Sequence, residues 1–176
     1  MNRKLYKQCI ETEVYGPHKR ETGRLTFFDK IWCRYFAPYS NSVYMIRRMH
    51  YLYSRRWGKI FAKLIHAKLT KKYGITIPIN GTVGIGLSIP HPSSITIASI
   101  EIGENFRIFQ NTTIGRKRSD LPLFPKIGNN VTLYANSSII GDVTVGDGVL
   151  IGAHSCLLHD APEAGTYVGV PAKKVR

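Results

Sequence analysis

The feature that most constrains this chain is an aliphatic residue that recurs every six positions through its second half. Helical faces repeat near 3.6 residues and strand faces at about two, so neither alone produces a strict six. Gly, Asn and Asp stand between many of the aliphatic positions, and these residues tolerate the positive φ of sharp corners. A short fixed period indicates stacked repeats, here triangular coils of short parallel strands with the aliphatic side chains inward. The three runs are Ile77, Val83, Ile89, Ile95; then Ile102, Ile108, Ile114; then Ile127, Leu133, Ile139, Val145, Ile151, Leu157.

Charge is distributed very unevenly along the 176 residues. Residues 1–73 carry 17 Lys and Arg against 4 Asp and Glu, a net +13 of the +14 total. The repeats are therefore nearly neutral, and the basic N-terminal part predicts a polyanionic partner or an anionic membrane surface. Nucleic acid is not expected, because no nucleic-acid-binding module is recognisable.

The N-terminal region, residues 1–74, is expected to be mainly helical. One short helix is predicted within residues 25–36, and a long one from Ser40 to Lys72, capped by Ser40 or Ser42. Gly58 marks a kink or a division of the long helix, and Gly74 its end. In one interpretation its apolar stripe packs on the first coils or on a neighbouring subunit, and its cations, including Arg47, form a solvated face. In the other, the helix lies on an anionic leaflet.

Cysteine usage and hydropathy indicate a cytoplasmic protein. The three cysteines, Cys9, Cys33 and Cys156, form no CxxC pair, which favours a reducing compartment. We recognise no secretory leader and no apolar run of the ~18 residues that a membrane span needs.

One corner of the repeats carries more than a repeat needs, namely Ile89-Pro90-His91-Pro92, in which two prolines fix where the histidine points. The segment 87–97 around it resembles the catalytic-histidine strand of the serine acetyltransferase branch of the hexapeptide-repeat acyltransferases. Segments 74–78, 109–115, 125–128 and 168–175 resemble the same branch, and the basic aromatic helix is similar to that of short relatives serving bacterial surface-polysaccharide synthesis.

The resemblance implies a mainly β fold, a left-handed parallel β-helix over residues 75–162 with a tail at 163–176. Residues 115–126 interrupt the repeats, and a long loop leaving a regular ladder usually has a function. In the family this loop crosses toward the next subunit of a homotrimer and walls the active site.

The resemblance also implies an acetyl-CoA-dependent O-acetyltransferase without a covalent acyl-enzyme. A hydroxyl must lose its proton as it attacks a thioester, and a neutral imidazole suits that task. His91 is the expected general base, and the backbone N–H of Gly115 is a candidate donor to the oxyanion. Expected binders of CoA are Lys126, Ala135, Ala153, Lys173 and Lys174, and expected binders of the acceptor are Gln110, Arg116, Arg118 and Phe124.

Three departures from the serine acetyltransferase pattern bear on the acceptor. Thr76 stands where the branch has an aspartate that orients the histidine, Phe124 replaces a second histidine, and Pro90 replaces an aspartate. These departures favour an uncharged acceptor, a hydroxyl of a bacterial surface polysaccharide or of its precursor. Serine O-acetyltransferase and a non-catalytic trimeric scaffold remain the alternatives.

A metal is not expected. His154 and His159 flank Cys156, but their directions should diverge on a tight coil and no second cluster completes a tetrahedral site.

Overall fold

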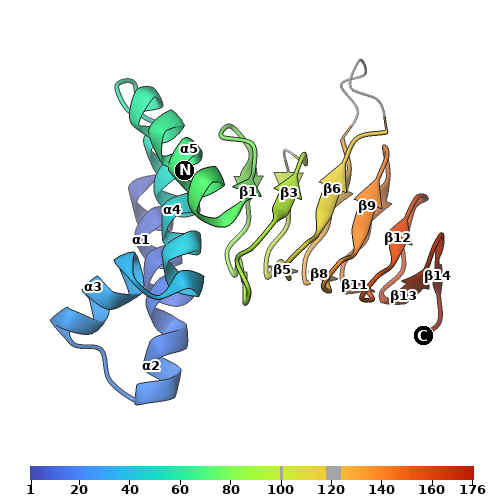
Figure 1. The fold of residues 1–176 in the computed structure, drawn as a ribbon, viewed down its shortest axis with the longest axis horizontal. Coiled ribbons are helices and arrows are strands. Elements are labelled where there is room, and N and C mark those ends of the chain that lie inside the picture. The colour runs from blue at the N-terminus through green and yellow to red at the C-terminus, as the bar shows by residue number, and fades with distance from the viewer. Residues whose placement is uncertain (100, 118–123) are drawn as a thin grey trace.

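The computed structural model describes residues 1–99, 101–117 and 124–176, and it shows a helical region attached to one end of a parallel β-solenoid (Figure 1). The helices lie at the start of the solenoid, and the C-terminus lies at its far end. The expected parallel β-helix with a helical N-terminal segment is confirmed.

The solenoid has three faces, each a sheet made of one strand from successive coils. In the described residues the sheets run β1-β3-β6-β9-β12, β10-β7-β4-β2 and β14-β13-β11-β8-β5. The pairing is parallel except for β13 with β14, which closes the far end. The strands are β1 (Ile75–Thr76), β2 (Thr82–Val83), β3 (Ile95–Ile97), β4 (Glu101–Ile102), β5 (Arg107–Ile108), β6 (Thr113–Gly115), β7 (Lys126–Ile127), β8 (Thr132–Leu133), β9 (Ser138–Ile140), β10 (Thr144–Val145), β11 (Val149–Ile151), β12 (Cys156–Leu157), β13 (Gly165–Gly169) and β14 (Ala172–Lys174).

The core of the solenoid is the predicted aliphatic ladder. All thirteen predicted positions are at most 9% exposed. The register places most of the predicted positions above one another, as in Ile108 beside Leu133 and Ile114 beside Ile139. The prediction is wrong for Ile95, because Ile97 takes the ladder position beside Ile114. Asn105, Asn111, Asn130 and Asn136 take positive φ at the corners, which is the role that the sequence assigns to such residues.

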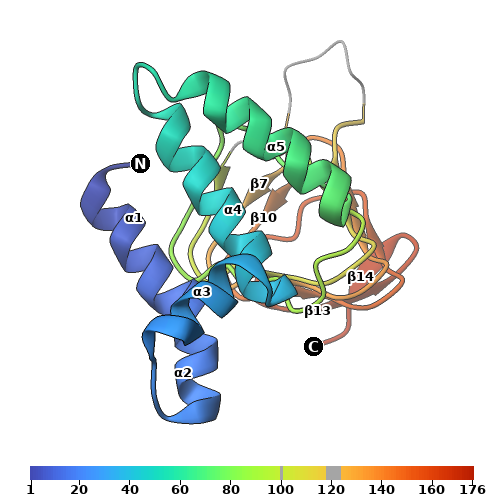
Figure 2. The same ribbon diagram turned by 60° about the vertical axis from the view of Figure 1, so that its left-hand side comes forward.

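The N-terminal region is helical almost throughout. It comprises α1 (Arg3–Cys9), the π-helix η1 (Ile10–Tyr15), α2 (Gly16–Thr22), α3 (Phe27–Tyr35), α4 (Pro38–Tyr53) and α5 (Lys59–Tyr73). The long predicted helix is thus divided at the Gly58 turn, and Gly74 ends α5 in the left-handed conformation as expected. Figure 2 shows α4 and α5 side by side across the end of the solenoid.

The predicted serine cap of α4 is wrong. The helix begins earlier, at Pro38, with Ala37 as its N-cap. Proline is favoured in the first turn because its fixed φ is helical and its missing N–H would have no helical partner there. The Ser42 hydroxyl donates instead to the Tyr39 carbonyl at 2.8 Å.

A buried ion pair joins the helices to the first coil. Arg47, expected at a solvated face, is 0% exposed, and its guanidinium binds the Glu13 carboxylate at 2.6 and 2.7 Å. Arg47 also donates to the Val83 and Gly84 carbonyls, each at 2.6 Å. Glu13 in turn accepts the backbone N–H of Gly86 at 2.7 Å. The ion pair therefore provides these backbone groups of the first coil with the hydrogen-bond partners that water would otherwise supply.

Candidate functional site

His91 lies at an exposed corner of the second half of the first coil. The corner follows the buried Ile89 and leads into β3, and Pro90 and Pro92 flank the histidine. The Ser93 N–H donates to the His91 carbonyl at 2.9 Å, which tightens the bend. The imidazole is thus presented outward from a stiff turn, as the two prolines predict.

Aromatic rings from the next coils line up beside His91. Its ring centroid lies 6.1 Å from that of Phe109, and Phe109 stacks on Tyr134 at 5.4 Å. The Arg107 guanidinium lies 5.1 Å from the Phe109 ring centre. These contacts give the imidazole an apolar side and a cation close by.

No carboxylate orients the His91 ring in the ranges that the structure describes. Thr76 is exposed in β1, and within the described residues the His91 ring makes no hydrogen bond. Packing against Phe109 is the ring contact that the structure provides.

Gln110, Ala135 and Ala153 follow His91 down the same corner of the solenoid. The Asn136 N–H donates to the Gln110 carbonyl and the His154 N–H to the Ala135 carbonyl, both at 3.1 Å. The Gln110 Oε1 is buried and has no hydrogen-bond partner among the described residues. The structure therefore brings together one expected acceptor residue and two expected CoA residues in a column below His91.

Gly115 lies at the following corner, not beside His91. It ends β6, where it pairs with Ile140 and accepts the N–H of Gly141 at 3.0 Å. One strand of the sheet thus separates it from the His91 corner. A single chain does not bring the expected base and the expected oxyanion donor together.

The base of the 115–126 loop holds two further expected residues. The Arg116 guanidinium lies 4.9 Å from the ring centre of Phe124, so these two meet across the loop. Arg118 lies outside the described residues. Lys126 is exposed at the start of β7.

The two C-terminal lysines differ in their surroundings. Both lie on β14 and are exposed. The Lys174 ammonium is 2.6 Å from the Glu163 carboxylate, and this contact raises the pKa of Lys174 and lowers that of Glu163. Lys173 has no such ion pair in the described part of the chain.

A cleft of about 450 Å³ opens beside the His91 corner between the helices and the first coils. Pro90 and Arg107 line it from the solenoid, and Arg20, Glu21 and Tyr39 from the helical region. Sequence reasoning missed Arg20 and Glu21, because no local pattern shows which face of the solenoid a helix 70 residues earlier will reach. The cleft offers two cations and a carboxylate to a small zwitterion.

The described residues contain no group of three His, Cys, Asp or Glu side chains that could hold a metal. His159 contacts the Ala172 and Asp160 carbonyls, and His154 faces Asn136. No helix in the described ranges is both long and apolar enough to cross a bilayer.

Comparison with known proteins points to one family. A family model described as bacterial transferase hexapeptide (six repeats) matches residues 124–159. Serine acetyltransferase from Helicobacter pylori is 31% identical over 140 residues, 78% of this chain and 81% of that protein. Serine acetyltransferase from Bacillus subtilis is 32% identical over 137 residues, 77% of this chain. The crystal structure of the Neisseria gonorrhoeae serine acetyltransferase superposes with a TM-score of 0.82 at 25% identity, over 99% of this chain and 68% of that one.

These relatives correct the predicted acceptor. The expected polysaccharide hydroxyl is wrong, because the similar proteins are serine acetyltransferases and favour the alternative. The error came from treating Thr76 and Phe124 as the loss of every group able to receive serine. The cleft beside His91 supplies other charged groups. The chain spans 63% of the length of the Bacillus subtilis relative.

Proposed function

The chain belongs to the serine acetyltransferase family, and we propose that it transfers the acetyl group of acetyl-CoA to the hydroxyl of L-serine. The serine Oγ attacks the thioester carbonyl while its proton moves to a base. The C–S bond then breaks, giving O-acetylserine and CoA thiol. The observation that carries the proposal is an exposed, proline-flanked His91 in a chain related over most of its length to enzymes of that name.

His91 is the general base of this proposal. A neutral imidazole accepts the hydroxyl proton as the bond forms and returns it to the leaving sulfur, which accounts for roughly 10²–10⁴-fold in rate. The apolar ring of Phe109 at its side holds the imidazole without a carboxylate. The backbone N–H of Gly115 is the proposed donor to the tetrahedral oxyanion.

The site requires a second subunit, since His91 and Gly115 lie at different corners of one chain. We assign a homotrimer in which the His91 corner of one subunit faces the Gly115 corner and the loop base of the next. Phe124 and Arg116 would then wall the acceptor side. Proximity of both substrates in one groove supplies much of the acceleration.

The CoA arm is assigned to the column below His91. The stacked backbone groups of Gln110, Ala135 and Ala153 are the proposed contacts of an extended pantetheine. Lys126 and Lys173 are the proposed phosphate contacts. Lys174 is a weaker candidate, because Glu163 already neutralises its charge.

Serine is assigned to the charged cleft beside Pro90. Arg20 and Arg107 are the proposed partners of the carboxylate, and Glu21 is that of the ammonium group; all three line the cleft. Bidentate Arg–carboxylate pairs are the strong form of such contacts. In this assignment Arg20, Arg107 and Glu21 take over from the aspartate and the second histidine of the branch, which Pro90 and Phe124 replace.

The proposed setting is the cytoplasm, where acetyl-CoA and reduced cysteines are found together. The +13 charge of residues 1–73 supports peripheral contact with an anionic membrane as a further proposal.

The deciding experiment compares wild type with His91→Ala and, as a control, with His154→Ala, an exposed histidine at the same corner. CoA thiol release with acetyl-CoA and L-serine should fall by at least about 10²-fold in His91→Ala and stay near wild type in His154→Ala. O-acetylserine should be the product by mass spectrometry. Absence of that product with wild type would overturn the acceptor, and CoA binding without turnover would fit the non-catalytic scaffold.

A further inference from the structure

A large cavity lies in the helical region, away from the His91 corner. It measures about 520 Å³ and is lined by side chains of α3, α4 and α5. We call it the α4–α5 groove. Nothing in the acetyl transfer uses it.

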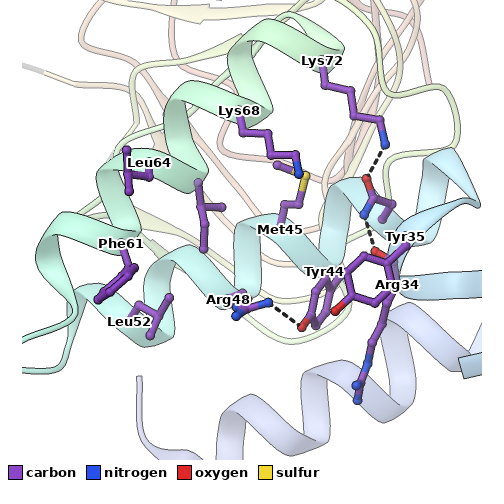
Figure 3. Close-up of a pocket in the computed structure, with 12 residues that line it drawn as sticks. Arg34, Tyr35, Tyr44, Met45, Arg48, Leu52, Phe61, Leu64, Lys68 and Lys72 are labelled. Carbon is purple, nitrogen blue, oxygen red and sulfur yellow. Dashed lines mark hydrogen bonds between the residues drawn. The ribbon is translucent and has the colours of Figure 1, made fainter. Parts of the chain in front are cut away.

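The groove is amphiphilic along its length (Figure 3). Leu52, Phe61 and Leu64 gather at the end where α4 leads into α5, and Arg34 and Lys72 lie at the opposite end. Arg48 and Lys68 lie between them, and no Asp or Glu is among the lining residues. The groove therefore offers an apolar half and a cationic half to one ligand.

The cations are held in place but not neutralised. Arg48 donates to the Tyr44 hydroxyl at 3.2 Å, and Lys72 to the Asn41 Oδ1 at 3.0 Å. The Arg34 guanidinium lies over the Tyr44 ring at 5.5 Å, and among the described residues its buried Nε has no hydrogen-bond partner. These neutral partners position the charges and leave them able to bind an anion.

The apolar half continues onto an exposed surface. Trp57 is 82% exposed in the turn before α5, and Ile60, Phe61 and Leu64 are 71%, 60% and 62% exposed on the helix. Spacings of three and four place these side chains on one face. Such a patch, with Arg55, Arg56, Lys59 and Lys63 beside it, has the composition of a helix lying in a membrane interface.

Charge decides between the two partners that an apolar groove admits. A second copy docked in the groove by its own helical region would bring another net +13 against these cations, and like charges oppose that pairing; the proposed homotrimer meets through the solenoid corners instead. An anionic surface gains from the same charge.

We propose that the α4–α5 groove binds an anionic phospholipid, with the phosphate among Arg48, Lys68 and Lys72 and the first acyl carbons against Leu52, Phe61 and Leu64. The exposed patch then lies in the surrounding leaflet. The proposal is independent of acetyl transfer.

The test is co-sedimentation of the full chain with phosphatidylcholine vesicles, with and without phosphatidylglycerol. Wild type should bind the anionic vesicles and not the neutral ones. Arg48→Gln/Lys68→Gln should bind about 30-fold more weakly, since each interfacial cation contributes about fivefold. The control Lys19→Gln/Arg24→Gln makes the same charge change on exposed residues outside the groove and should stay within about threefold of wild type.

A second measurement follows the apolar half. In a Trp32→Phe background, the emission of Trp57 should shift to the blue with anionic vesicles, and Leu64→Ser should reduce the shift. Each variant should keep the solution acetyltransferase rate of its own parent, either wild type or Trp32→Phe, which separates this test from that of the active site. Failure of wild type to bind, equal losses in the two charge variants, or sedimentation showing that Leu64→Ser dissociates paired copies would overturn the proposal.

Discussion

At the scale of single residues, Arg47 and Glu13 form the most buried charged contact described. Removing one partner leaves the other charge buried and uncompensated, which typically costs about 4 kcal/mol. Arg47→Met should therefore lower the free energy of unfolding by about 4 kcal/mol, measured by urea titration. Arg47→Met/Glu13→Leu should recover part of that loss, because no lone carboxylate remains; a double variant as unstable as the sum of both single variants would contradict this account.

His50 should make stability depend on acidity. Burial lowers the pKa of His50 from 6.5 to about 4, and the ring is 5% exposed with its Nε2 donating to the Pro78 carbonyl at 3.1 Å. As pH falls from about 6.5 to about 4, the unfolded chain takes up a proton that the folded chain excludes, so stability is lost across that window.

The loss should approach about 3 kcal/mol near pH 4 and level off below it. Urea unfolding of wild type at pH 7.5 and pH 4.5 should show this difference, and His50→Gln should show less of it. Equal pH dependence in the two proteins would exclude His50 as the source.

Residue identity alone predicted the exposed, proline-flanked corner at His91, but not the groups that surround it. The proline-flanked corner is local in sequence, so its exposure followed from a few adjacent residues. Arg47 was placed on a solvated face, because its buried carboxylate partner lies 34 residues away and outside any helical pattern. Arg20 and Glu21, which line the cleft beside Pro90, were missed for the same reason.

At the scale of elements, one edge of the solenoid is built on a column of glycines. A Cβ at Gly103 would collide with backbone of Gly128, one at Gly128 with Gly146, and one at Gly146 with Pro162. Each coil therefore approaches the next more closely than any side chain allows.

Gly103→Ala should lower the free energy of unfolding by about 2 kcal/mol or more, because the Gly128 backbone of the next coil must move. Gly16→Ala is the matched control: its Cβ would meet atoms only at 3.5 Å in a helical conformation, so it should be neutral or slightly stabilising. Thermal denaturation of the two variants checks the difference, and equal melting temperatures would argue against close coil packing as the constraint.

Elements were predicted in proportion to how periodic they are. The six-residue ladder specifies the coils except at the His91 corner, where two extra residues move the inward position from Ile95 to Ile97. The helical region has no such repeat: proline chemistry moved the start of α4, and residues 1–24 became helical through contacts with α4 rather than through a pattern of their own.

At the scale of the whole molecule, the catalytic proposal depends on assembly. Sedimentation equilibrium should give three times the 19.8 kDa mass of the chain. Dilution that dissociates the assembly should abolish turnover, since no single chain unites the His91 and Gly115 corners. A fully active monomer would contradict the shared site. The handedness of the solenoid and the number of subunits could be expected only from the family resemblance, because the periodicity of one chain determines neither.

The antiparallel closure by β14 has a consequence for how this protein behaves in solution. The last coil of a stack of parallel coils has unpaired backbone N–H and C=O groups, so another molecule could add its strands there, as happens at the end of an amyloid fibril. The hairpin at one extremity and the helices at the other make the rod finite. Chains ending at residue 162 should therefore associate through the uncovered last coil, which sedimentation would show as a larger mass than that of the intact assembly, and the helices that still cover the other end should prevent longer filaments.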